Sequence, residues 1–320
     1  MVVTNVLNSE LEQKKGIKQG LRIIKINGVD VHEHVATNIK PFIGSSTKQW
    51  LNLLAYGRNA TRGRRSESVH LTFKDENNQV FESAISRSLP ENNLERSLFE
   101  FSILENNIGL LRINSFWHEN FTTYFDSIYE KILTTDALII DIRMNSGGNS
   151  LNSEYVLSHL TNESFRMAEW SSLRYIPAFV SWNRPVEWYV GAPRYIQPIQ
   201  NKPIYDRPVA VIIDESTFSA AEDFCVGFRN MNRGLIIGTP SAGSTGNSVF
   251  FELPGGGSVQ ICAIKNTFPD GTEFVGIGIL PDIEVRETVS SFFSRTESGA
   301  DNTNAVRKAV EVLKNSMRNK

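Results

Sequence analysis

Cysteine and net charge are scarce in this sequence, and long apolar runs are absent. The 320 residues contain two cysteines, Cys225 and Cys262, which have no metal-ligand spacing. Both stand among apolar residues, which predicts two buried small side chains. The net charge of −2 lacks the basic excess of a nucleic-acid-binding protein. No run approaches the ~20 apolar residues that span a bilayer, and no signal peptide is visible.

These absences exclude several classes of protein. We expect no nucleic-acid partner and no integral membrane segment in this chain, and nothing in it points to a cofactor or a metal site. What is present is typical of a globular protein, with 40% hydrophobic and 21% charged residues. The length suffices for one large domain or two ordinary ones.

Residues 1–90 are predicted to form a small β-rich domain. Strands are expected at 21–26, 68–73 and 80–85, and a helix at 47–62. The order of these elements, with Gly16-Ile17-Lys18-Gln19-Gly20 before the first strand, resembles a PDZ domain. Such domains bind an extended peptide by adding it as a strand, often at its free C-terminus, which would place Gly20, Leu21 and Ile23 at the peptide. The alternative is a domain that only packs against its neighbour.

Residues 91–320 are predicted to form an α/β domain with a mainly parallel sheet. Apolar, β-branched runs at 108–113, 137–142, 209–213 and 235–238 alternate with helical segments at 121–134, at 151–160 and from 219. We interpret residues 91–105 as a polar linker and 304–317 as an amphipathic helix. The aromatic-rich segment 170–195 is expected to form either a lid or a packing surface.

Ser219 is the candidate catalytic residue. It follows the buried run 209–213 and precedes a helix, so its hydroxyl is expected at the carboxyl edge of the sheet, beside free N–H groups and the positive end of a helix dipole. Such N–H groups can hold an oxyanion when the serine attacks a carbonyl. However, Ser219 and Glu222 also fit a capping box, which is the commoner meaning of this spacing.

A second turn follows the strand predicted at 137–142. Asp141-Ile142-Arg143-Met144-Asn145-Ser146-Gly147-Gly148 ends in two glycines, which let backbone N–H groups approach a ligand. The alternative is an ordinary strand-to-helix loop. Both turns lie at the carboxyl ends of strands, where open α/β sheets place their sites.

Four motifs in order resemble the tail-specific, or C-terminal processing, protease family, peptidase family S41. They are Asp141-x-Arg143-x-Asn145-x-Gly147-Gly148, Ser219-Ala220-Ala221-Glu222, Ile237-Gly238-Thr239-Pro240-Ser241-Ala242-Gly243 and Gly278-Ile279-Leu280-Pro281-Asp282-Ile283. The resemblance implies a ClpP/crotonase-like core after the PDZ-like domain, and a serine endopeptidase. It also implies that Ser219 is the nucleophile, and that Ala220 and either Gly147 or Gly148 provide the oxyanion hole.

The general base is the open question at the sequence level. One branch of the family uses a lysine about twenty-five residues after the serine, where this chain has Ser244, so the resemblance is to the other, tricorn-core-like branch. That branch takes a histidine from before the PDZ domain and a glutamate near Val275, from which Glu273 is two residues away. We therefore expect the base outside this chain, in an N-terminal region that is missing here, with Ser244 and Glu273 as supporting candidates. His118 is an alternative base within the chain.

Three functions follow as hypotheses. The first is a serine endopeptidase that acts on peptide or protein substrates, and the second is a catalytically inactive peptide-binding relative. The third, acyl-group chemistry on a crotonase-like core, has no matching coenzyme A site in this sequence. The resemblance implies an exported protein of the periplasm or cell envelope, in some relatives a lipoprotein.

Overall fold

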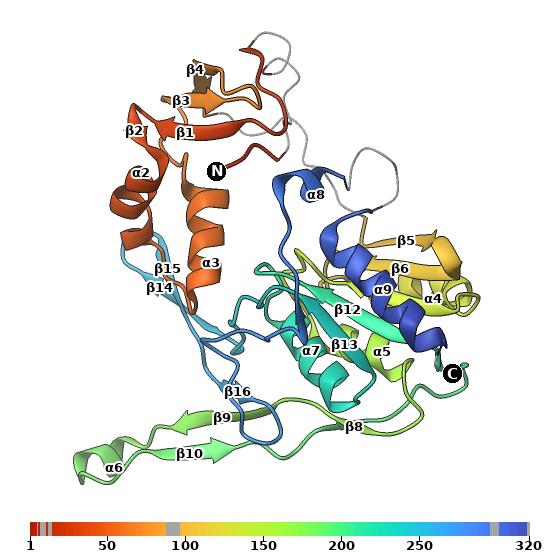
Figure 1. Cartoon of the computed structure of the whole chain (residues 1–320). Coiled ribbons are helices and arrows are strands. Elements are labelled where there is room, and N and C mark those ends of the chain that lie inside the picture. Colours follow the sequence, from red (N-terminus) through yellow and green to blue (C-terminus); the bar gives the residue numbers. More distant parts are fainter. Residues whose placement is uncertain (5, 7–10, 12–14, 88–96, 295–300, 319–320) are drawn as a thin grey trace. The chain divides into compact units, whose positions relative to one another are not determined.

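The computed structural model describes residues 1–4, 6, 11, 15–87, 97–294 and 301–318, in two compact units, Met1–Arg96 and Ser97–Lys320 (Figure 1). Each unit has its own hydrophobic core. Among the described residues, no helix has both the length and the apolar character needed to cross a bilayer.

The first unit is a four-stranded antiparallel sheet with helices. The strand order is β2 (Val29–Asp30), β1 (Arg22–Ile26), β3 (Ser68–Lys74), β4 (Val80–Ser86). The helices are α2 (Val31–Asn38), a 3-10 turn at Lys40–Phe42 and α3 (Lys48–Asn52), which continues as a π-helix over Leu53–Asn59. The three predicted strands and the helix are therefore present, although the helix widens after its first turns.

The second unit is built on a six-stranded sheet, which confirms the predicted α/β class with a mainly parallel sheet. Its order is β17 (Ile283–Glu284), β13 (Gly234–Gly238), β12 (Val209–Ile213), β7 (Ala137–Asp141), β6 (Ile108–Ile113), β5 (Phe99–Leu104). All neighbours are parallel except β5 and β6. The prediction of a linker over residues 91–105 is wrong where β5 forms. An edge strand exposes one face and therefore carries polar residues, which resemble those of a linker. Residues 88–96 lie outside the described residues.

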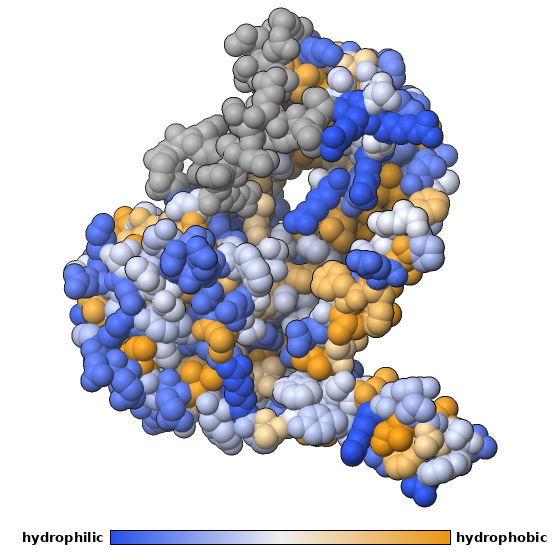
Figure 2. All heavy atoms as spheres, turned by 180° about the vertical axis from the view of Figure 1, so that it is seen from behind, coloured by the Kyte–Doolittle hydropathy of each residue, from blue (hydrophilic) through white to orange (hydrophobic). Residues whose placement is uncertain are grey.

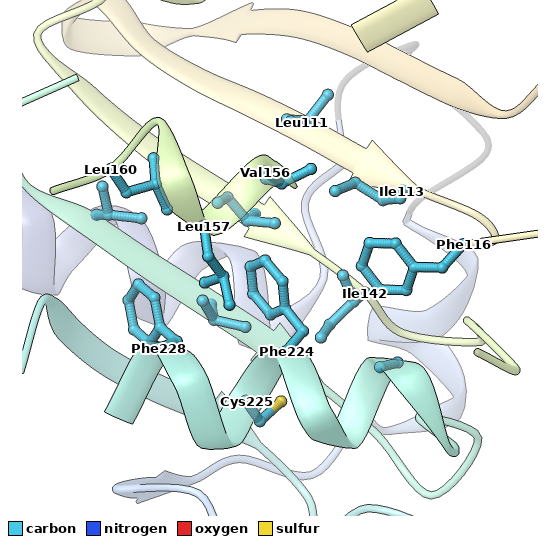
Figure 3. Packing of buried hydrophobic residues seen from close by; sticks show 14 of the residues in the cluster. Leu111, Ile113, Phe116, Ile142, Val156, Leu157, Leu160, Phe224, Cys225 and Phe228 are labelled. Atoms are coloured by element: carbon cyan, nitrogen blue, oxygen red, sulfur yellow. The ribbon is translucent and has the colours of Figure 1, made fainter. Parts of the chain in front are cut away.

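Helices cover both faces of this sheet. On one face lie α4 (Phe121–Ile132), α5 (Ser150–Ser158) and α7 (Ala220–Asn230), whose apolar residues pack on the sheet with Leu111 and Ile113 (Figure 3). On the other face, α9 (Asn304–Arg318) packs on the alternate residues of the same strands, such as Leu110. Because strands β6, β7 and β12 are covered on both sides, they are almost continuously apolar.

Smaller elements extend from the core of the second unit. They are β8 (Phe165–Arg166) with β11 (Tyr195–Ile196), β9 (Glu169–Arg174) between β10 (Glu187–Val190) and β16 (Lys265–Thr267), β14 (Val249–Leu253) with β15 (Gly257–Ile261), α6 (Pro177–Ser181) and α8 (Val289–Phe293). The aromatic-rich segment thus forms a hairpin whose end exposes apolar side chains (Figure 2). Trp182 is among the exposed residues of this segment. Cys225 is buried as predicted, but the prediction for Cys262 is wrong: it follows an exposed strand and is itself exposed.

Candidate active site

The two turns singled out in the sequence lie side by side. Strands β7 and β12 are parallel neighbours in register, with Asp141 opposite Ile212, so both chains leave the sheet at the same edge. Hydrogen bonds then join the turns: the Phe218 N–H donates to the Asn145 carbonyl at 3.0 Å, and the Thr217 hydroxyl donates to the Ile142 carbonyl at 3.1 Å. The double glycine and the serine are therefore held against one another.

Ser219 has a backbone conformation that an ordinary helix cap does not need. Its φ is 56° and its ψ is −121°, a region that costs a non-glycine residue about 1–3 kcal/mol. Thr47 and Thr288 also cap helices, and both have negative φ and extended backbone. The capping box is nevertheless present, because the Glu222 carboxylate accepts the Ser219 N–H at 3.2 Å. The cap therefore coexists with a strained turn of the kind found at nucleophilic serines.

Gly147 allows the close approach of the two turns. A Cβ built on this residue would lie 2.6 Å from the Phe218 carbonyl oxygen and 2.8 Å from the Ala220 nitrogen, both well inside van der Waals contact. Its φ of 87° is also disfavoured for other residues. Any side chain at this position would therefore push the Ser219 turn away.

The backbone N–H groups around Ser219 differ in availability. The Gly147 N–H donates to the Asn145 side-chain oxygen at 2.8 Å, whose amide in turn donates to the Ile113 carbonyl at 2.9 Å. By contrast, no acceptor for the N–H of Gly148 or Ala220 is found among the described residues. Of the two glycines considered as oxyanion donors, Gly148 is the one with an available N–H.

Glu222 links the Ser219 turn to a third loop. Its buried carboxylate accepts from the Ser241 hydroxyl at 2.5 Å and from the N–H groups of Gly243 and Ser244 at 2.7 and 2.9 Å, in addition to Ser219. Burial raises the pKa of Glu222 to about 7, although its hydrogen bonds oppose that shift. Ser244, a supporting candidate, is thus connected to Ser219 through this carboxylate.

A cavity of about 500 Å³ opens beside Ser219 and Gly148. Ser219 itself is half-buried at its edge. The other lining residues come from α5, α7, β9 and β16 and from the loops between the elements: Trp117, Asn149, Ser150, Leu151, Glu154, Met167, Ala168, Trp170, Arg194, Asp223, Thr245, Asn247, Ile264 and Asn266. A substrate that enters this cavity would therefore reach the Ser219 turn.

Glu154 and Asp223 also line the cavity. The sequence alone did not reveal these two acids as site residues. Burial raises the pKa of Glu154 to about 7, an effect that the Arg194 guanidinium, 2.6 Å away, partly opposes. Burial also raises the pKa of Asp223 to about 6, although the Ser150 hydroxyl donates to it at 2.8 Å. The spacing of Asp223 four residues after Ser219 was a usable signal, whereas Glu154 follows no pattern around the double glycine.

None of the five histidines lines this cavity. His118 directly follows Trp117, which lines the cavity. However, the Nδ1 atom of His118 accepts the Asn120 N–H at 3.0 Å, and its ring lies 5.0 Å from that of Tyr124. Glu273 is also absent from the cavity: its half-exposed side chain pairs with Lys265. The structure therefore does not bring His118 or Glu273 to Ser219.

In the first unit, the expected peptide-binding edge already has a partner. The Val3 N–H donates to the Leu21 carbonyl at 2.8 Å, the Gly20 N–H donates to the Val3 carbonyl, and the Ile23 N–H donates to the Met1 carbonyl. Leu21 is buried, and Ile23 borders an apolar groove of about 590 Å³ that Val3, Val6 and Tyr56 of the π-helix also line. A peptide could pair with this edge only by displacing residues 1–3.

The Asp141 and Arg143 motif is part of a buried ion network. Arg143 donates to both oxygens of Asp141, at 2.9 and 2.8 Å, and to Asp301 at 3.1 Å, while Arg112 bridges the same two aspartates. Burial alone would lower the pKa of Arg143, but the neighbouring carboxylates, Asp141 above all, outweigh it and raise this pKa. The network ties the start of the double-glycine turn to the loop before α9.

Sequence comparison identifies related proteins. The model of peptidase family S41 matches residues 107–285, more than half of the chain. A carboxyl-terminal-processing protease of Picosynechococcus sp. is 23% identical over 176 residues, which cover 55% of this chain and 38% of the relative. A carboxy-terminal-processing protease of Bartonella bacilliformis is 32% identical over 82 residues, or 26% of this chain and 19% of the relative. The chain thus matches well under two thirds of each relative.

Structure comparison gives a longer match. Mature CPAF superimposes with a TM-score of 0.71 at 18% identity, over 94% of this chain and 78% of CPAF. The photosystem II D1 C-terminal processing protease superimposes with a TM-score of 0.50 at 17% identity, over 85% of this chain and 65% of that protein. At these identities the similarity establishes the fold alone.

Proposed function

This chain belongs to peptidase family S41, and from that premise we propose that it is a serine endopeptidase of the C-terminal processing type with Ser219 as its nucleophile. The observation that carries the proposal is the strained turn at Ser219, which lies against Gly147 and borders a cavity also lined by Gly148, whose N–H is available. A capping serine alone would explain none of these features.

The chemistry follows from this arrangement. Attack by the Ser219 hydroxyl oxygen forms a bond to the substrate carbonyl carbon, and the hydroxyl proton passes to a general base. The N–H groups of Gly148 and Ala220 stabilise the negative oxygen, and each such donor contributes about 3 kcal/mol in the transition state. The amine leaves with the proton, and water then hydrolyses the acyl-serine.

We assign the general base to a histidine outside these 320 residues, as in the tricorn-core-like branch. No histidine of this chain reaches the cavity, and Ser244 occupies the position of the lysine used in the other branch. The same observation favours the alternative, a catalytically inactive peptide-binding relative.

An activity-based probe separates the two. We expect a fluorophosphonate to label the full-length protein, and labelling to disappear in the Ser219→Ala variant. Ser127→Ala is the matched control, because that serine is exposed on α4 and donates only to the local Tyr124 carbonyl. Labelling that persists without Ser219 refutes its role, and a full-length protein that is never labelled supports the inactive relative.

The first unit fits the role of a PDZ-like peptide-binding domain, spanning about residues 1–90. Its apolar groove has a volume of about 590 Å³, and Ile23 and Tyr56 contribute to its wall. The proposal includes a peptide or protein substrate bound through its C-terminus, and an exported, cell-envelope location. Binding of a C-terminal peptide with a free carboxylate, but not of its amide, is the corresponding measurement.

A further inference from the structure

Three residues that line the cavity beside Ser219 each have a buried side-chain oxygen with no hydrogen-bond donor. These oxygens are Glu154 Oε1 from α5, Asp223 Oδ1 from α7 and Asn266 Oδ1 from β16. Within the described residues, five buried side-chain nitrogen or oxygen atoms lack a partner, and three of the five are these. Leaving a polar atom buried and unpaired costs about 1–3 kcal/mol, so three residues of this kind around one cavity favour a ligand that supplies donors as their side chains turn toward it.

The charges in the cavity narrow the kind of donor. Arg194 is the one basic residue among the described residues of the lining, and it binds only the other Glu154 oxygen, Oε2. Its side chain is 49% exposed, whereas the side chain of Glu154 is 6% exposed. With both acids ionised, the lining carries one more negative than positive charge, so a cationic donor is favoured over a neutral one.

Part of the remaining wall is apolar, beside the polar Asn149, Thr245 and Asn247. Trp117, Leu151, Met167 and Trp170 line the same cavity. Lysine and arginine side chains combine an apolar stem with a cationic end that carries several hydrogen-bond donors. The cavity therefore matches a basic side chain in both its walls and its polar end.

We propose that this cavity is a specificity subsite for the lysine or arginine side chain of the substrate residue whose carbonyl carbon is presented to Ser219. Ser219 and Gly148 line the same cavity, and Asp223 lies one helical turn after Ser219 on α7. A side chain next to the scissile bond can therefore enter while its carbonyl faces the oxyanion donors. The inference rests on the proposed function of Ser219.

The test compares two peptidyl diphenyl phosphonates that differ only in the last residue, a lysine analogue and its uncharged isostere norleucine. We expect the lysine probe to label Ser219 about tenfold faster or more, since a charged hydrogen bond contributes at least one power of ten. The preference should disappear in the Glu154→Gln/Asp223→Asn variant and increase in Arg194→Gln, which removes the competing cation. Glu130→Gln, an exposed acid on α4, is the matched control and should change nothing.

A fluorophosphonate without a peptide separates the two proposals. If it labels Ser219 while the norleucine probe matches or exceeds the lysine probe, the subsite is refuted and the nucleophile is upheld. If it does not label, binding of dansylated pentapeptides with a central lysine or norleucine decides by fluorescence anisotropy. Tighter binding of the lysine peptide by about tenfold supports the subsite, and equal binding overturns it.

Discussion

Replacing Gly147 by alanine tests whether close approach of the two turns positions Ser219. The new Cβ would meet the Phe218 carbonyl oxygen at 2.6 Å and the Ala220 nitrogen at 2.8 Å, so the backbone of the serine turn has to move. A misplacement near 1 Å at a reacting group costs about a hundredfold in rate. We therefore expect phosphonate labelling of Ser219 to slow by about two orders of magnitude.

The loss of stability separates into two parts. A side chain at a positive φ costs about 1–2 kcal/mol, and overpacking adds about 1–3 kcal/mol. Gly255→Ala is a matched control for the first part alone, because its φ of 88° equals that of Gly147 within a degree and no atom lies within 4 Å of its built Cβ. We expect Gly147→Ala to lower the Tm by about 5–15 °C and Gly255→Ala by about 2–6 °C.

Calorimetry and labelling of both variants give the two readouts. The comparison does not depend on activity alone, since the difference in Tm appears even in an inactive protein. If Gly147→Ala is no more harmful than Gly255→Ala in either readout, the close packing of the turns is not what holds Ser219.

Three further predictions concern buried charges. The pKa of Glu222 rises from 4.5 in the unfolded chain to about 7 in the folded protein. The protonated carboxyl therefore stabilises the fold at low pH, and this contribution to the free energy of unfolding is lost as the pH rises from 4.5 to about 7. At about 1.4 kcal/mol per pH unit, the loss is up to about 3 kcal/mol. Denaturant titrations at pH 5 and pH 8 should show this slope in the wild type, and a correspondingly shallower one in Glu222→Gln. Replacing Arg143 by methionine should lower the free energy of unfolding by about 3–5 kcal/mol, because the buried Asp141 and Asp301 lose a partner. Urea titration measures this loss, and a value below about 1 kcal/mol would contradict a stabilising role of the ion network. Finally, the ratio of the labelling rates of the lysine and norleucine probes should fall as the pH drops below about 6–7, because Glu154 and Asp223 become neutral. Titration of the general base affects both rates equally and cancels in the ratio. A ratio independent of pH would contradict the assignment of these two acids to the subsite.

The central sheet and the serine turn could be predicted from the sequence because each depends on local pattern. Strands β6, β7 and β12 are buried on both faces and hence continuously apolar, and the turn after β12 combines a polar loop with the start of a helix. Edge strand β5 was missed because half of its residues face outward and resemble a linker.

The cavity beside Ser219 could not be predicted in this way. Glu154, Asp223 and Asn266 come from three elements that are far apart in sequence, and their shared feature, an unpaired buried oxygen, exists only after folding. The choice between Gly147 and Gly148 as donor likewise depended on a tertiary contact, the hydrogen bond from Gly147 to the Asn145 side chain. Motif order identifies the nucleophile candidate, whereas packing defines its surroundings.

The most direct measurement is a crystal structure of the full-length protein after reaction with a peptidyl phosphonate. Our account predicts a bond from Ser219 Oγ to phosphorus, with the phosphonyl oxygen about 2.7–3.1 Å from the nitrogens of both Gly148 and Ala220. An adduct on another residue, or a phosphonyl oxygen that points away from these two nitrogens, would contradict it.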